Sequence, residues 1–268
     1  MESLQDLLYK YPAYEEAEQV FETKGKHIVY GLGGSQKSFI FSQAIRRIGA
    51  KPTIIIVHDK EHKERWERDL AFLLPQVEVI PFPITEKVAF ITAARSLENQ
   101  ALQMGALGKL LTGKSVVVLA TIEEATQYIV SPTVLSEYII NFDLHDEVNR
   151  EDLLEKLVAS GYERTDQVEQ RGHFSVRGDI IDIFPVNSDN PYRIEFFDDE
   201  IDTIRIFSRD TQRSIEVVDD CTIMPFNIHE DNQANGAEHN DLNETDSLLS
   251  YGHNGIIIYD EPNRLQEA

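Results

Sequence analysis

The chain has 268 residues, 41% of them hydrophobic and 9% aromatic, which is typical of globular domains that bury a core. Lys and Arg number 25 against 47 Asp and Glu, so the formal net charge is −22, and such a surface as a whole repels the phosphates of nucleic acids. A single cysteine, Cys221, excludes an intrachain disulfide and a multi-cysteine zinc site. The absence of a long apolar run and an acidic start that lacks the pattern of a signal peptide predict a cytoplasmic protein with no membrane partner.

The first part of the chain alternates short apolar runs with longer amphipathic segments, starting from a strand expected at residues 27–30. Residues 53–57 and 116–119 are apolar at almost every position, as expected of strands that are covered on both faces. This β-α-β-α series predicts an α/β domain with a parallel sheet over residues 1–134.

The pattern changes near residue 138. A helix is expected in the segment EDLLEKLVASG, and closely spaced alternating runs follow it, separated by Asn, Asp, Ser, Pro and Gly. We expect a smaller α+β domain with a hairpin-built sheet over residues 135–225. Residues 226–268 begin as an acidic connector and end in a buried-strand pattern that returns to the first domain, which suggests a fragment of a longer chain.

Residues 31–38 read GLGGSQKS, and seven of these eight positions fit the phosphate-binding pattern GxxxxGK[ST] that begins with Gly31. The exception is Gln36, which replaces the glycine that lets backbone N–H groups approach a phosphate. Lys37 and Ser38, which would contact phosphate oxygens and Mg²⁺, are retained. We predict a nucleotide site that has lost its ligand, with residual binding as the alternative.

A second part of such a site is present late in the chain. Asp260 and Glu261 follow the apolar run 256–259, as the two acids of a Walker B strand do when they hold Mg²⁺ and orient water. Both halves of an ATP site are therefore recognisable, and one of them is damaged.

Strand alternation in residues 192–197 places Tyr192, Ile194 and Phe196 on one face, and Arg193, Glu195 and Phe197 on the other. The first set predicts a core face. The second places an aromatic ring among charges, as at the centre of an interface. The alternative is a ring covered by its own domain, with Arg193 paired to Glu195 or to the acids at 198–200.

Two other clusters of polar residues could suggest a metal site. The acids Asp198, Asp199, Glu200 and Asp202 lie between two alternating runs, which favours a solvated hairpin turn. His58 and His62 are four residues apart with Asp59 and Glu61 between them, but a strand end intervenes and no third ligand is evident. We therefore predict no metal site and, since no triad or glutamate pair has a suitable spacing, no catalytic residue.

The stretch RGHFSVRGDIIDIFPVNSDNPYRIEFFDDEIDTIRIFSRDTQRS, residues 171–214, resembles the second domain shared by UvrB and the transcription-repair coupling factor. Together with the GLGGSQKS loop and the IIIYDEP run, it makes the whole chain similar to the N-terminal UvrB-homology module of the coupling factor (Mfd). Gln36 and the short link at residues 82–91, which leaves no room for the DNA-locking hairpin of UvrB, favour the coupling factor over UvrB.

The resemblance implies a RecA-like first domain and a second domain that binds UvrA by mimicking UvrB, through Arg177, Arg193 and Phe197. It implies an adaptor that recruits UvrA to RNA polymerase stalled at DNA lesions. This chain would need no cofactor and would not be an enzyme. RNA polymerase, DNA, ATP and Mg²⁺ would be bound by other domains of the full-length protein, an ATP-dependent DNA translocase. The alternatives are an ATP-binding motor fragment and a UvrB-like clamp on damaged DNA.

Overall fold

The computed structural model describes residues 12–49, 51–84, 93–226, 245–253 and 255–267, and its chain forms two compact units. The first unit combines residues 1–82, 109–127 and 251–268, and the second combines residues 83–108 and 128–250. The sequence analysis placed the first domain boundary at residue 134 and expected the end of the chain to return to the first domain. In the structure the first unit is discontinuous, because the end of the chain contributes a strand to its sheet.

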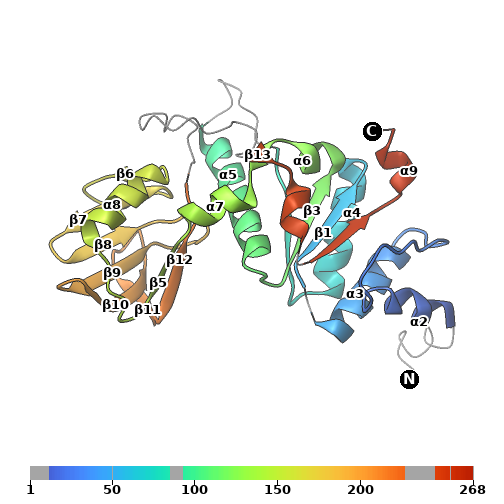
Figure 1. Cartoon of the computed structure of the whole chain (residues 1–268), viewed down its shortest axis with the longest axis horizontal. Helices are drawn as coiled ribbons and strands as arrows, with labels where there is room; N and C mark the ends of the chain where they lie inside the picture. The colour runs from blue at the N-terminus through green and yellow to red at the C-terminus, as the bar shows by residue number, and fades with distance from the viewer. Residues whose placement is uncertain (1–11, 50, 85–92, 227–244, 254, 268) are drawn as a thin grey trace. The chain divides into compact units, whose positions relative to one another are not determined.

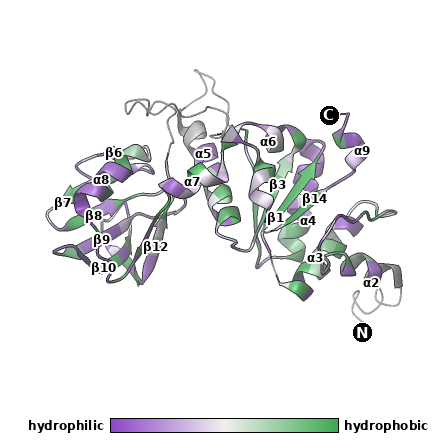
Figure 2. Ribbon diagram, in the orientation of Figure 1, coloured by the Kyte–Doolittle hydropathy of each residue, from purple (hydrophilic) through white to green (hydrophobic). Residues whose placement is uncertain are grey.

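The first unit contains a four-stranded parallel sheet in the order β14-β1-β3-β2 (Figure 1). Its strands are β1 (Thr53–Val57), β2 (Glu78–Pro81), β3 (Val116–Thr121) and β14 (Ile256–Tyr259). Ile54, Ile55 and Ile56 are all fully buried, so both faces of β1 are covered, and Figure 2 shows hydrophobic residues along these central strands. The prediction of a parallel sheet is confirmed.

The helices of the first unit are α2 (Pro12–Gln19), α3 (Gln36–Ile48), α4 (Lys60–Leu73), α6 (Ile122–Thr126), α9 (Pro262–Leu265) and the end of α5 (Ala93–Leu111). Helices α3 and α4 pack on one face of the sheet through Phe41, Trp66 and Leu70. The side chain of Asp59 caps α4 by accepting the backbone N–H of His62. That hydrogen bond is the main cause of the lowered pKa of Asp59.

The prediction of a strand at residues 27–30 is wrong. These residues have no regular secondary structure, and the side chains of Ile28 and Tyr30 are exposed. In the sheet that the structure describes, β1 is paired with β14 on one side and with β3 on the other, and residues 27–30 pair with none of its four strands. The predicted short link at 82–91 and the acidic connector lie largely outside the described residues.

The second unit contains a six-stranded sheet in the order β11-β10-β9-β8-β7-β6. Its strands are β6 (Glu163–Arg164), β7 (His173–Arg177), β8 (Ile180–Ile183), β9 (Tyr192–Phe197), β10 (Glu200–Phe207) and β11 (Ser214–Val218). All neighbours are antiparallel except β6 and β7. Helix α8 (Arg150–Ala159) contributes Leu153 and Leu157 to the core that this sheet forms.

Smaller elements complete the second unit. This unit also contains helix α7 (Pro132–Tyr138), most of α5, and two short strand pairs, β4 (Ile129–Val130) with β13 (Thr245–Asp246) and β5 (Ile140–Asp143) with β12 (Asp220–Ile223). A 3₁₀ helix, Leu248–Gly252, leads back to the first unit. Within the described ranges, no helix has the length and apolar character needed to cross a bilayer.

The hairpin between β9 and β10 confirms the interpretation of the acidic run as a turn. Strand β9 ends at Phe197 and β10 begins at Glu200, so Asp198 and Asp199 form the turn, with Asp198 at a φ of 55°. Along β9, Ile194 and Phe196 are buried in the core, whereas Phe197 is 74% exposed. The two adjacent phenylalanines therefore lie on opposite faces of the sheet.

This pair gives a direct test of the fold. We expect Phe196→Ala to reduce the free energy of unfolding by about 3–5 kcal/mol, because it removes a buried ring and leaves a cavity. Phe197→Ala is expected to change it by no more than about 0.5 kcal/mol, as for an exposed position. Chemical denaturation monitored by circular dichroism measures both, and equal losses would contradict the assigned faces.

Candidate functional site

Arg177, Arg193 and Phe197, the residues singled out for partner binding, lie on one face of the six-stranded sheet. Arg193 and Phe197 are on alternate positions of β9. Arg177 of β7 is in register with Ile180 of β8, which is in register with Glu195 of β9. Since in-register neighbours share a face, the three residues define one surface, which we call the outer face.

A buried carboxylate organises the two arginines. Asp182 of β8 lies opposite Arg193 and is only 1% exposed. Its Oδ1 accepts a hydrogen bond from Nε of Arg193 at 2.7 Å. Its Oδ2 accepts two, from Nη2 of Arg193 at 2.9 Å and from Nη2 of Arg177 at 2.5 Å. One carboxylate thus holds both guanidinium groups, and its contact with Arg193 has the bidentate geometry that is typical of strong pairs.

The two arginines are not equally accessible. The guanidinium of Arg193 also lies over the ring of Phe207 at 4.6 Å, and its side chain is 19% exposed, against 51% for Arg177. The hydrogen bonds from Arg193 to Asp182 raise the pKa of Arg193. The alternative in which Arg193 pairs with Glu195 is wrong, because Asp182 is its partner and Glu195 contacts Arg205 at 3.4 Å.

Asp182 was missed in the sequence analysis. The signal that could have found it is an acid within the apolar strand DIIDIF, since an acid at a covered position requires a cation nearby.

The outer face extends to the edge of the sheet, where Val217 of β11 is in register with Arg205, and Arg205 is in register with Arg193. Val217 and Ile215 are exposed, so apolar surface lies beside the arginines.

The loop at residues 31–38, which the sequence analysis predicted to be a degenerate phosphate loop, precedes and opens α3. Gln36, at the first position of this helix, turns its side chain back onto the loop, and its Oε1 accepts the backbone N–H of Gly33 at 3.0 Å. In a working loop such N–H groups bind phosphate oxygens. Here a side chain of the loop itself accepts one of them.

The acids predicted to form the second half of the site do meet the loop. Nζ of Lys37 donates to Asp260 at 2.5 Å and to Glu261 at 2.8 Å. The other oxygen of Asp260 accepts the indole N–H of Trp66 at 2.9 Å. The lysine that would bind phosphate is therefore already neutralised by two carboxylates within the first unit.

Ser38 lines the same pocket as these acids but forms a hydrogen bond with a different carboxylate. Its hydroxyl group is buried and donates to Asp69 of α4 at 2.5 Å. Trp66 and Asp69 were not predicted as members of this cluster, because they lie in a helix whose apolar stripe indicates core packing. A pocket is nonetheless present here, with Gly34, Lys37, Trp66, Asp260 and Glu261 among its lining residues.

The ion pairs shift the pKa values of their members. Burial alone would lower the pKa of Lys37, but the hydrogen bonds and charges of Asp260 and Glu261 outweigh it, so this pKa is raised. The hydrogen bond from Lys37 is the main cause of the lowered pKa of Glu261. Both charged forms are thus favoured in the folded protein.

The match to a family model falls within the second unit. Residues 140–229 match the family described as the UvrB interaction domain. The chain carries a UvrB interaction domain. It is 34% identical to the transcription-repair-coupling factor of Bacillus subtilis over 200 residues, 75% of this chain and 17% of that protein.

Two further relatives support the same assignment. UvrABC system protein B of Methanothermobacter thermautotrophicus is 32% identical over 217 residues, 75% of this chain and 33% of that protein. The transcription-repair-coupling factor of Haemophilus influenzae is 31% identical over 173 residues, 65% of this chain and 15% of that protein. The resemblance to a UvrB-homology module of the coupling factor is confirmed. The chain spans a third or less of the length of these relatives.

The Lys37–Glu261 pair predicts a dependence of stability on pH. Because the pKa of Glu261 is lowered, this residue adds to the free energy of unfolding above its unfolded pKa of about 4.3, and that stabilisation is lost as the pH falls. Because the pKa of Lys37 is raised, this residue adds to the free energy of unfolding below its unfolded pKa of about 10.4, and that stabilisation is lost as the pH rises. We expect Glu261→Gln to lower the free energy of unfolding by about 0.5–1 kcal/mol near pH 7.

Denaturation at pH 7 and pH 3 measures this effect. The difference between the original chain and Glu261→Gln should shrink at pH 3, where the carboxylate is protonated. Glu216→Gln, at an exposed position of β11, is the control and should show little difference at either pH. A Glu261→Gln effect of equal size at both pH values would contradict the role given to the ion pair.

Proposed function

We propose that the chain is a non-catalytic adaptor module that binds UvrA through the outer face of its second unit. The observation that carries the proposal is the pair of arginines fixed by Asp182 beside the exposed Phe197, within a UvrB interaction domain. In a longer protein this module would recruit UvrA to RNA polymerase stalled at DNA lesions. Contacts with RNA polymerase and DNA would belong to regions outside this chain.

The chemistry of the outer face suits a partner that presents carboxylates around an apolar pocket. The guanidinium of Arg193 uses Nε and one terminal nitrogen on Asp182 and retains its other terminal nitrogen, while Arg177 is half exposed. Because Asp182 limits the rotamers of both side chains, less conformational entropy is lost when they bind. Phe197 would provide the desolvated centre that strengthens the surrounding polar contacts.

For the first unit, we propose a RecA-like scaffold that has lost its nucleotide. The support is the occupation of each phosphate-binding group by the protein itself: the N–H of Gly33 by Gln36, Lys37 by Asp260 and Glu261, and the hydroxyl of Ser38 by Asp69. A nucleotide would have to replace several charge-assisted contacts before binding. We assign no cofactor and no catalytic role to this chain.

UvrA binding provides the main test of the outer face. We expect Arg177→Ala and Phe197→Ala each to weaken binding by about 2 kcal/mol or more, the scale of an interface hot spot. Arg193→Ala should weaken binding similarly and also lower the melting temperature, because it leaves the buried Asp182 with one partner fewer. Isothermal titration with purified UvrA and thermal melting measure the two effects separately.

Matched controls come from exposed residues elsewhere in the chain. Phe72→Ala removes an exposed phenylalanine of α4, and Arg209→Ala removes an exposed arginine beyond the end of β10. Neither should change the affinity for UvrA. If the triple variant Arg177→Ala, Arg193→Ala, Phe197→Ala retains full affinity while folded, UvrA binds elsewhere or not through this chain.

For the first unit, we expect isothermal titration of the original chain with Mg-ATP to give no saturable heat. Gln36→Gly frees the N–H of Gly33 but leaves Lys37 in its ion pairs, so we expect at most weak binding to return. Lys37→Ala in the Gln36→Gly background is the control and should remove any such binding. Micromolar affinity of the original chain for Mg-ATP would favour the motor-fragment alternative instead.

A further inference from the structure

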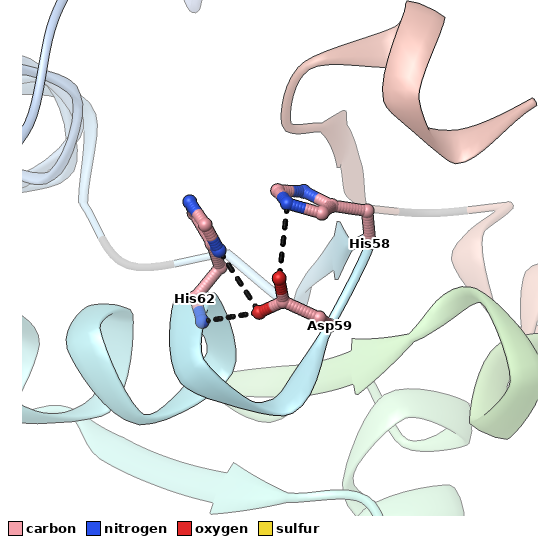
Figure 3. Close-up of side chains that lie close together, drawn as sticks. All are labelled: His58, Asp59 and His62. Carbon is pink, nitrogen blue, oxygen red and sulfur yellow. Dashed lines mark hydrogen bonds and ion pairs between the residues drawn. The ribbon is translucent and has the colours of Figure 1, made fainter. Parts of the chain in front are cut away.

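A cluster of metal-ligating side chains lies at the junction of β1 and α4, where two histidines flank one aspartate (Figure 3). His58 follows the last residue of β1, Asp59 is the N-cap of α4, and His62 is in the first turn of this helix. The sequence HDKEH therefore brings both imidazoles to one side of the helix start. The sequence analysis found no third ligand for the two histidines, and in the structure the carboxylate of Asp59 contacts both of them.

The distances within the cluster suit a small cation. Nε2 of His58 lies 3.1 Å from Oδ2 of Asp59, and Nδ1 of His62 lies 2.9 Å from Oδ1 of Asp59. The two imidazole rings are 4.0 Å apart between centroids, and one donor atom from each residue lies within 4.8 Å of the others. Ligands about 2.0–2.2 Å from a tetrahedral zinc ion are separated by about 3.4 Å, so only small adjustments are needed.

The fold holds these three residues firmly. The carboxylate of Asp59 accepts the backbone N–H of His62 at 2.8 Å, which fixes its orientation relative to α4. The side chains of His58 and His62 are 11% and 17% exposed, whereas that of Asp59 is 46% exposed, so the cluster is ordered by packing and open to solvent on one side. An ion could enter from that side without a rearrangement of the backbone.

A second observation concerns His58. Its Nδ1 is buried and has no hydrogen-bond partner within the part of the chain that the structure describes. A buried polar atom without a partner is uncommon in folded proteins. Within the described residues, Asp59 is the acid that forms an ion pair with His58, and it also pairs with His62, so the two imidazoles share a single carboxylate. The ring nitrogen of His58 that faces the cluster is Nε2, so a cation would bind His58 through Nε2 and not through the buried Nδ1.

The nearby charges favour a cation. His62 lines the same pocket as Asp69, Asp260 and Glu261, while Lys37 and Arg65 supply the positive charge there. Lys37 is already paired with Asp260 and Glu261, and Arg65 is paired with Glu61. The acids therefore outnumber the bases around this part of the first unit, and Asp59 adds a further negative charge.

We propose that His58, Asp59 and His62 form a binding site for one borderline divalent transition-metal ion such as Zn²⁺. Two imidazole nitrogens and one carboxylate are the donors that such ions take, whereas Mg²⁺ and Ca²⁺ favour sets of oxygen donors. Three protein ligands leave a coordination position for water or another exchangeable ligand. The site lies in the first unit and is independent of UvrA binding.

Cobalt(II) provides a spectroscopic test with the whole chain. Titration with Co²⁺ should produce visible absorption bands that saturate at one ion per chain, and Zn²⁺ should abolish them by displacement. The melting temperature should rise with Zn²⁺, because an ion that binds only the folded state stabilises it. We expect His58→Ala and His62→Ala each to weaken Zn²⁺ binding at least tenfold, and the double variant to lose the Co²⁺ spectrum.

Two further variants make the result specific. Asp59→Asn keeps a good helix cap but removes the negative charge, so it should weaken Zn²⁺ binding while the protein remains folded. His145→Ala is the matched control, because His145 contacts Glu200 at 2.8 Å without a second imidazole in that ion pair; it should leave the spectrum unchanged. The proposal is overturned if the original chain shows no saturable binding, or if the folded double variant binds Co²⁺ as well as the original chain.

Discussion

The buried carboxylate of Asp182 is the constraint on which the outer face of the second unit depends. A charge that is 1% exposed requires partners, and Arg177 and Arg193 provide them from the strands on either side of β8. The residues that would contact a partner are therefore also residues that stabilise the sheet. A surface built in this way cannot lose Arg193 without a cost to the fold, so any recognition through this residue is linked to stability.

The degenerate site of the first unit shows the same use of internal partners. In a nucleotide-binding loop, phosphate oxygens satisfy the backbone N–H groups and the lysine. In this chain Gln36 accepts one such N–H group, that of Gly33, and the acids at 260–261 pair with Lys37. Lys37 thereby joins α3 to the segment after β14, which is a structural role.

The sequence was informative where periodicity and turn chemistry were strong. The alternation in YRIEFF placed Phe196 and Phe197 on their correct faces, and the acids after it indicated the hairpin. Residues 27–30 were assigned wrongly because a short apolar run does not specify a neighbour in a sheet. Asp182 was missed, and the hydrogen bond from Trp66, a core residue, to Asp260 was not predicted because its partner is distant in sequence.

The discontinuity of the first unit determines the order in which the chain can fold during synthesis. Thr53 of β1 pairs with Ile256 of β14, so the parallel sheet stays incomplete until nearly all of the chain has left the ribosome. The six-stranded sheet of the second unit, whose strands lie between residues 163 and 218, is available earlier and contains mostly local hairpins. The UvrB interaction domain can therefore acquire its structure before β1 has paired with β14.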